Sequence, residues 1–298
     1  MKFDVVATNP PFQDSTNQKK TQHKLWIKFT QSSFDKWLNP GGILLQVSPS
    51  SFLSPSNKIL DIFRKKIVKY LNLDSAKYFP LVGSTFADYL IVNSKSNAEV
   101  TTIKTDKFTF DKCIDESVFY FPNDLCEESY SIHKKVIFDY PDKLDVKYDY
   151  VNCHNVLIHR NDAISKTKTD IHIYPIFHTN KQTWYSKIRQ SWANENKIMW
   201  SRSGYTKVFY DDGVLGGTDM VYYVLVSDKK EGKNLTYNLS SKLIQYILRT
   251  AKWSGFGNEK VFKRLPNLPK NVKLTDEQIY DLFNLSNNER QYVEQNIK

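Results

Sequence analysis

The chain has 298 residues, of which 40% are hydrophobic, and 42 Lys and Arg residues against 32 Asp and Glu residues give a net charge of +10. This length accommodates two domains, and no apolar run approaches the length that spans a membrane. No signal peptide is evident, and the cysteines have neither metal-site nor disulfide spacing (Cys113, Cys126 and Cys153), so a reduced, cytoplasmic setting is expected.

The first hundred residues alternate between strand and helix patterns. Expected strands are 3–7, 43–47, 71–79 and 86–93, and expected helices are 24–38 and 58–70. This alternation predicts a parallel sheet with helices on its faces. Later strands are expected at 172–177, 197–200 and 220–226, a helix at 240–250, and a helical hairpin at 274–297 whose second helix begins at the N-cap Ser286 with a capping box closed by Glu289.

Charge is distributed unevenly and indicates four segments. Residues 1–98 and 151–273 are basic, whereas the segment 99–150 and the tail 274–298 are acidic. The segment 151–273 holds 20 Lys and Arg against 9 Asp and Glu residues. Basic surface interleaved with aromatic rings suits nucleic acid, although a solvated basic surface explains the charge equally well.

The most specific motif is Asn9-Pro10-Pro11-Phe12, directly after the first strand. It resembles motif IV of DNA amino-methyltransferases. In that reading, the Asn9 side-chain oxygen and the Pro10 carbonyl accept hydrogen bonds from an exocyclic amine, the prolines keep the loop rigid, and Phe12 stacks on a flipped base. The plainer alternative is a Pro-Pro strand terminator followed by a core phenylalanine.

The neighbouring segments strengthen this resemblance. A Pro40-Gly41-Gly42 turn, a buried strand and a Ser50-Ser51-Phe52-Leu53 turn follow, as in adenine-N6 enzymes. Phe79, before Pro80, is similar to the motif VIII aromatic that packs on the other face of the base, and Tyr78 and Phe86 are nearby alternatives. A buried core ring is the competing interpretation of Phe79.

The later half of the chain resembles the target-recognition region of Eco57I/TaqI-like restriction-modification methylases. The similar segments include Tyr174-Pro175-Ile176-Phe177 and Arg264-Leu265-Pro266. The resemblance implies an α/β fold that begins with the C-terminal portion of a Rossmann-like methyltransferase sheet, the catalytic half, at residues 1–98. An acidic connector or outer layer would follow at 99–150. A mixed α/β target-recognition domain would occupy 151–273, and a helical tail 274–298. It also implies binding to double-stranded DNA, with candidate contacts around two glycine-containing turns: Arg202, Lys207, Lys252 and Lys260.

The cofactor motif of this family does not appear in the chain. The family binds S-adenosylmethionine through a Phe-x-Gly-x-Gly loop between a strand and a helix. The segments Gly213 to Gly217 and Gly255 to Gly257 are weak matches, since neither joins a convincing strand to a helix. We therefore expect the cofactor site to be incomplete in this chain, with an upstream segment or a second chain supplying it.

The sequence thus predicts an adenine-N6 DNA methyltransferase portion of restriction-modification type. The alternative is a non-catalytic DNA-binding specificity protein, and cytosine-N4 or protein-glutamine methylation uses the same acceptor chemistry.

No metal site is expected, because the six histidines are scattered and Cys153-His154 with His159 lacks zinc spacing. Glu231-Gly232-Lys233 has the Glu-x-Lys form of restriction nucleases, but it is interpreted as a solvated turn.

Overall fold

The computed structural model describes residues 1–12, 25–55, 58–79, 85–96, 99–149, 163–179, 182–202, 207–252 and 259–297. The chain separates into two compact units, Met1–Lys134 and Lys135–Lys298. We call these unit 1 and unit 2, and each is described by itself.

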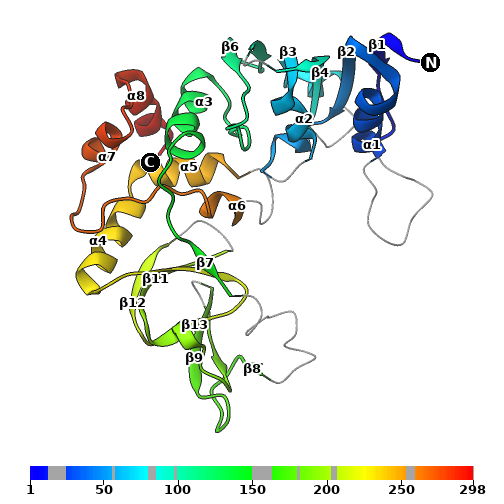
Figure 1. Ribbon diagram of the computed structural model, residues 1–298. Helices are drawn as coiled ribbons and strands as arrows, with labels where there is room; N and C mark the ends of the chain where they lie inside the picture. Colours follow the sequence, from blue (N-terminus) through cyan, green and yellow to red (C-terminus); the bar gives the residue numbers. More distant parts are fainter. Residues whose placement is uncertain are drawn as a thin grey trace. The chain divides into compact units, whose positions relative to one another are not determined.

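Unit 1 is built on one six-stranded sheet with the strand order β1-β2-β4-β3-β5-β6 (Figure 1). Its strands are β1 (Phe3–Thr8), β2 (Leu38–Pro49), β3 (Lys66–Asn72), β4 (Phe86–Lys95), β5 (Val100–Lys104) and β6 (Thr109–Cys113). Its α-helices are α1 (Leu25–Ser32), α2 (Ile59–Lys65) and α3 (Glu127–His133), and short 3-10 turns occupy Ser50–Leu53 and Ser75–Tyr78. The predicted strands at 3–7, 43–47 and 86–93 are confirmed, as is a helix within 24–38.

Three expectations for unit 1 are wrong. The strand expected over 71–79 does not form there, because β3 ends at Asn72 and Ser75–Tyr78 is a 3-10 turn. The sheet is mixed and not parallel: β1 pairs with β2 in parallel, but β4 is antiparallel to both β2 and β3. The helix expected over 58–70 ends at Lys65, and Lys66–Asn72 forms β3 between β4 and β5. Ile67, Val68 and Tyr70 have stiff or bulky side chains that suit a pleated strand, and pairing on both sides satisfies its backbone.

Aromatic side chains join the helices of unit 1 to its sheet. Phe52 stacks on Phe63 of α2 with ring centroids 4.9 Å apart, and Tyr89 of β4 meets both rings edge-on at 5.6 and 5.0 Å. Trp26 of α1 meets the Phe52 ring edge-on, with ring centroids 6.4 Å apart. All four side chains are buried, so this cluster fixes α1 and α2 on one face of the sheet.

Unit 2 contains two four-stranded sheets and a group of helices. One sheet has the order β13-β9-β10-β8 and the other β12-β11-β14-β7. The strands are β7 (Lys147–Tyr148), β8 (Ile164–Ser165), β9 (Tyr174–Thr179), β10 (Gln182–Ser186), β11 (Asn196–Ser201), β12 (Phe209–Asp212), β13 (Gly216–Gly217) and β14 (Val221–Leu225). The helices are α4 (Lys229–Leu239), α5 (Lys242–Thr250), α6 (Glu259–Phe262), α7 (Asp276–Leu282) and α8 (Asn287–Asn296).

The sequence predictions for unit 2 are confirmed for the strands that became β9, β11 and β14, for α5 and for the terminal helix pair. The capping box at α8 is also confirmed, because Ser286 and Glu289 exchange side-chain-to-backbone hydrogen bonds. The acidic segment 99–150 is divided between the units: β5 and β6 extend the sheet of unit 1, while residues from 135 onward belong to unit 2. In the segment Gly213–Gly217, residues 213–215 link β12 to β13, and no helix follows directly.

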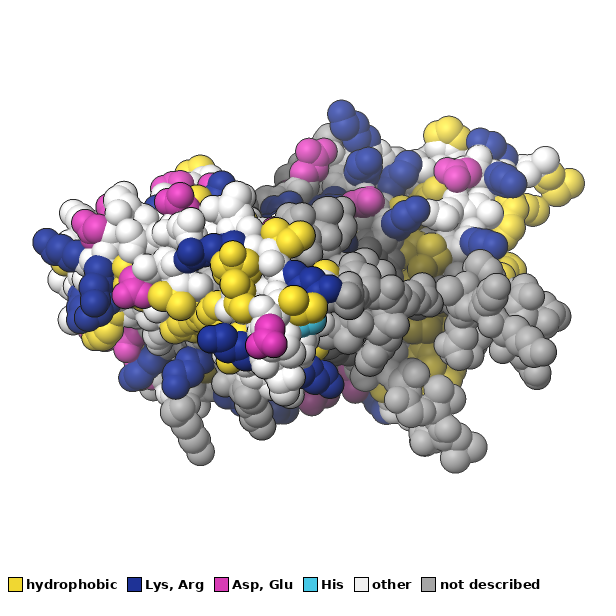
Figure 2. All heavy atoms as spheres, turned by 90° about the horizontal axis from the view of Figure 1, so that it is seen from below, with side chains coloured by type: hydrophobic (Ala, Val, Ile, Leu, Met, Phe, Trp, Pro, Cys, Tyr) yellow, Lys and Arg dark blue, Asp and Glu magenta, His cyan; other side chains and the backbone are white. Residues whose placement is uncertain are grey.

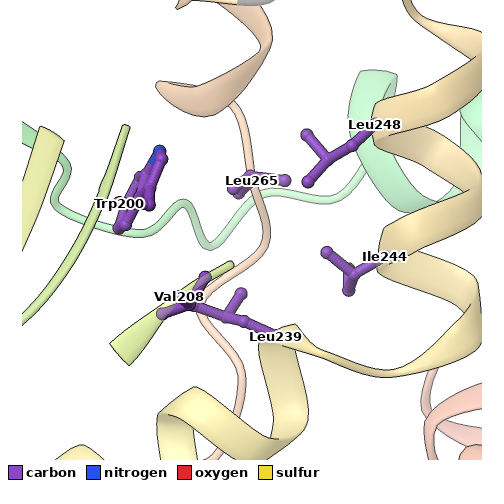
Figure 3. Close-up of a pocket in the computed structure, with 6 residues that line it drawn as sticks. All are labelled: Trp200, Val208, Leu239, Ile244, Leu248 and Leu265. Atoms are coloured by element: carbon purple, nitrogen blue, oxygen red, sulfur yellow. The ribbon is translucent and has the colours of Figure 1, made fainter. Parts of the chain in front are cut away.

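An apolar core connects the strands of unit 2 to its helices. Figure 3 shows Trp200 of β11 and Val208 facing Leu239, Ile244, Leu248 and Leu265, with no room between them for a water molecule. Phe262 of α6 meets the Trp200 ring edge-on at 5.8 Å. Because these six apolar side chains are all buried, β11 and α5 are expected to unfold together.

No helix in the described ranges is long and apolar enough to cross a membrane. Nor do any three His, Cys, Asp or Glu side chains of the described residues lie together as a metal site would require.

A buried histidine gives the stability of unit 1 a defined pH dependence. His133 is fully buried, with its Nδ1 atom 2.6 Å from the Tyr120 hydroxyl oxygen, and burial lowers its pKa from 6.5 to about 3. Below pH 6.5 the unfolded chain therefore binds a proton that the folded chain does not bind. The free energy of unfolding should fall by about 2 kcal/mol between pH 7 and pH 5 through this residue alone.

Urea unfolding of the chain and of the His133→Gln variant at both pH values measures this contribution. The variant has no titrating group at this position, and its glutamine offers Tyr120 a polar partner. The wild-type protein should lose about 2 kcal/mol more than the variant. An equal loss in both would show that His133 titrates normally in the folded protein.

Candidate functional site

The Asn9–Phe12 loop lies where three strand ends meet. In the parallel pair of β1 and β2, Thr8 is opposite Gln46, so Asn9 and Pro10 follow alongside the last residues of β2. In the antiparallel pair of β2 and β4, Pro49 is opposite Phe86. The carboxyl ends of β1 and β2 and the start of β4 therefore share one edge of the sheet, which is where open α/β sheets bind ligands.

The first two residues of the loop differ in exposure. Asn9 is exposed and Pro10 is buried. A buried proline ring fixes the backbone beside it, and proline has no N–H group to compete for an acceptor. The loop thus presents the Asn9 side-chain amide to solvent on a rigid support, with the Pro10 carbonyl as a second acceptor on the same short segment.

Three phenylalanine rings gather beside this loop. The Phe12 and Phe86 ring centroids lie 5.0 Å apart, and the Phe79 and Phe86 centroids lie 4.5 Å apart. Phe86 is buried, while Phe12 and Phe79 are half-buried. The structure therefore brings the two predicted stacking residues together through a third ring, which the sequence indicated only as an alternative. Tyr78, the other alternative, is 67% exposed.

A carboxylate holds the turn that precedes Phe79. Asp88 of β4 accepts hydrogen bonds from the Asn72 side-chain amide, at 2.8 Å, and from the Ser75 hydroxyl. The Asn72 oxygen accepts the Asp74 N–H at 3.0 Å. One strand thus carries Phe86 and also positions the turn leading to Phe79. The sequence analysis missed this network, although Asn72-Leu-Asp74-Ser75 carries the turn-forming residues that signal it.

A second set of hydrogen bonds fixes the turn after β2. The Ser50 N–H donates to the Thr85 carbonyl at 3.0 Å, and the two side-chain hydroxyls also hydrogen-bond to each other. Beneath them, buried Gln46 donates to the Thr30 hydroxyl at 2.7 Å. Burial raises the pKa of neighbouring Tyr89 to about 12, so its hydroxyl stays protonated.

The candidate DNA contacts in unit 2 lie on two segments that the fold brings together. Arg202, at the end of β11, forms an ion pair with Glu259 of α6 at 2.6 Å. Lys207 and Lys260 are exposed, and Lys252 is half-buried. The turns at 203–206 and 253–258, where sequence-reading contacts were expected, lie outside the described residues. The ion pair shows that the flanking segments adjoin, and their role in DNA binding stays a prediction.

Comparison with known proteins places the loop in a family context. The model of the family described as Eco57I restriction-modification methylase matches residues 1–82, which include the Asn9–Phe12 loop, Phe79 and the turn held by Asp88. Residues 1–82 are therefore similar to part of this methylase family. No curated protein sequence matches the chain.

Several solved structures resemble parts of the chain. The Type I restriction enzyme EcoKI M protein is 24% identical over 35% of this chain and 25% of its own, with a TM-score of 0.29. A DrdV–DNA complex is 11% identical over 89% of this chain and 42% of its own, with a TM-score of 0.41. The Type ISP enzyme LlaBIII bound to DNA is 10% identical over 97% of this chain and 29% of its own, with a TM-score of 0.39. The chain thus spans less than half the length of each of these proteins.

The Asp88 network gives a testable consequence for the site. Replacing Asp88 with Ala leaves the buried Asn72 side-chain amide without this acceptor, and the buried Ser75 hydroxyl keeps only the Asn72 carbonyl, at 3.2 Å. We expect the free energy of unfolding to fall by about 1–3 kcal/mol. The matched control is Asp111→Ala on exposed β6, where only the Thr102 hydroxyl loses a partner and the change should stay within about 0.5 kcal/mol. Equal losses in urea unfolding would contradict a specific role for Asp88.

Proposed function

We propose that this chain carries the amine-acceptor loop and the DNA-recognition portion of an adenine-N6 DNA methyltransferase of restriction-modification type. The observation that supports the proposal most directly is the placement of Asn9 and Pro10. They follow β1 at a sheet edge beside a phenylalanine cluster, within the segment that matches a methylase family model.

The acceptor loop suits the chemical difficulty of the reaction. An exocyclic amine on a base is a poor nucleophile because its lone pair is delocalised into the ring. Hydrogen bonds from its two N–H groups to the Asn9 Oδ1 atom and the Pro10 carbonyl oxygen favour a pyramidal nitrogen with an available lone pair. Acceptors held by a buried proline need no reorganisation during the reaction, which lowers the barrier.

The phenylalanine cluster suits a base taken out of the duplex. Phe12 and Phe79 are half-buried, so each keeps ring surface for stacking, while Phe86 is buried between them as a support. We propose that a flipped adenine stacks on Phe12 and Phe79 with its amine at Asn9. Stacking and the amine contacts together offset the cost of unpairing the base.

The methyl donor of such an enzyme is S-adenosylmethionine, which supplies an electrophilic methyl group when bound. The described residues of unit 1 do not fit a complete site for it, because they contain no glycine-rich turn between a strand and a helix. A Cβ atom on Gly42 would lie 3.1 Å from the Phe3 carbonyl oxygen, so this glycine serves the packing of β2 on β1. We propose that a further segment or a second chain completes the donor site.

We assign DNA binding to unit 2, on the basis of its basic segment and of Arg202, Lys207, Lys252 and Lys260. A non-catalytic specificity protein with the same DNA-binding portion is the alternative. The two differ in one respect: only the methyltransferase transfers a methyl group to DNA in a manner that depends on Asn9.

Replacing Asn9 with Ala tests the proposal. In a preparation active on DNA, methyl transfer should fall by about a hundredfold or more, because one positioned acceptor is lost, while the Kd for duplex DNA stays nearly unchanged. Asn39→Ala is the matched control: its side-chain amide donates to Asp4, near the opposite end of β1, and the variant should keep full activity. Unchanged turnover in Asn9→Ala would refute the assignment. DNA binding without any methyl transfer, even with the further segment or second chain that completes the donor site present, would favour the non-catalytic alternative.

A further inference from the structure

Four exposed aliphatic side chains gather at one end of the β13-β9-β10-β8 sheet. Ile171 is 57% exposed, Ile173 45%, Ile188 73% and Val214 51%. In the antiparallel pair of β9 and β10, Ser186 is opposite Tyr174, so Ile173 and Ile188 lie at the same end. β13 runs parallel to β9 with Gly216 opposite Ile176, which brings Val214 to that end as well. We call these four residues the isoleucine tip.

The turn that presents Ile188 is held on both sides. Its N–H donates to the Ser186 hydroxyl at 3.1 Å. Two residues further on, buried Gln190 donates to the Gly217 carbonyl at 3.0 Å and accepts the Gly217 N–H at 2.8 Å. Ile188 is therefore projected by an anchored turn, and its exposure is a built feature of the fold.

The loop that carries Val214 is equally constrained. The Asp211 carboxylate accepts the Val214 N–H at 3.1 Å and is itself paired with buried Lys197 at 2.6 Å. Gly213 has a φ of +88°, and a Cβ atom there would lie 2.5 Å from the Asn194 carbonyl oxygen. The Arg189 guanidinium donates to the Gly213 carbonyl at 3.1 Å, which joins this loop to the Ile188 turn.

Charge next to the tip favours a polyanion as its partner. The two neighbours of Ile188 in sequence, Lys187 and Arg189, are both cationic. Asp170 and Asp212 adjoin the outer ends of the tip segments but do not flank Ile188. Figure 2 shows hydrophobic side chains interspersed with Lys and Arg side chains, and with fewer Asp and Glu side chains, on the face seen from below. A protein-binding patch would be expected to have few lysines at its centre, whereas cations around an apolar side chain suit a groove between phosphates.

We infer that the isoleucine tip is a DNA-contacting element of unit 2. Ile188 enters a groove of duplex DNA, where it lies against sugars and base edges, and Lys187 and Arg189 bind phosphates on either side. Apolar side chains inserted into a groove in this way unstack or bend the duplex locally. The inference rests on the proposed DNA-binding function and adds a site of contact distinct from the region around Arg202.

The test is fluorescence anisotropy of the full chain with a mixed-sequence duplex at several salt concentrations. Ile188→Ala should weaken binding about tenfold at every salt concentration and leave the salt slope unchanged, because it removes buried apolar surface and no charge. Lys187→Ala should lower the slope by about one. Val272→Ala is the matched control, since it shortens an exposed aliphatic side chain of the same unit and should leave affinity unchanged. Thermal unfolding verifies that each variant is folded.

Other outcomes separate this inference from the function on which it rests. If the wild-type chain binds duplex DNA and Ile188→Ala binds equally well, the tip is not a contact element although the proposed function stands. If the wild-type chain shows no salt-dependent binding, both fail. If sedimentation shows a wild-type dimer that Ile188→Ala dissociates, the tip is a self-association surface and the inference is overturned.

Discussion

The register between β1, β2 and β4 is the constraint on which the candidate site depends. Thr8 opposite Gln46 and Pro49 opposite Phe86 bring the Asn9–Phe12 loop, the Ser50 turn and Phe86 to one edge of the sheet. Side chains alternate between the faces of a sheet, so a slip of one residue would move Tyr89 out of the buried aromatic cluster under α1 and α2 and Gln46 away from Thr30. The core thus fixes the register, and the register fixes the site.

The site itself is divided between rigid support and exposed chemistry. Pro10, Phe86 and Asp88 are buried or half-buried and hold the local backbone, whereas Asn9 is exposed and Phe12 and Phe79 keep part of their ring surface. Acceptors and stacking surfaces mounted on a packed sheet lose little entropy when a ligand binds. The proposed amine acceptor requires this arrangement, because catalysis depends on atoms that are already in place.

The sequence predicted the strand before Asn9, the Pro-Pro turn that ends it and the terminal helix pair, because each has a local signal: a short apolar run, two prolines or a capping box. It failed where long-range pairing decides. Residues 66–70 continue the amphipathic pattern of α2, yet pairing with β4 and β5 makes them a strand. The direction of β4 likewise has no local signal. Asp88 was missed because its partners Asn72 and Ser75 lie on the neighbouring strand and the turn after it, and only the folded sheet brings them within reach.

The product of the reaction tests the central claim most directly. Duplex DNA would be incubated with S-adenosylmethionine and the protein expressed from its native gene, digested to nucleosides and analysed by mass spectrometry. Our account predicts N6-methyladenine, formed by the wild-type protein and lost when Asn9 is replaced. Methylation of cytosine or of a protein glutamine, with adenine unmodified, would contradict it.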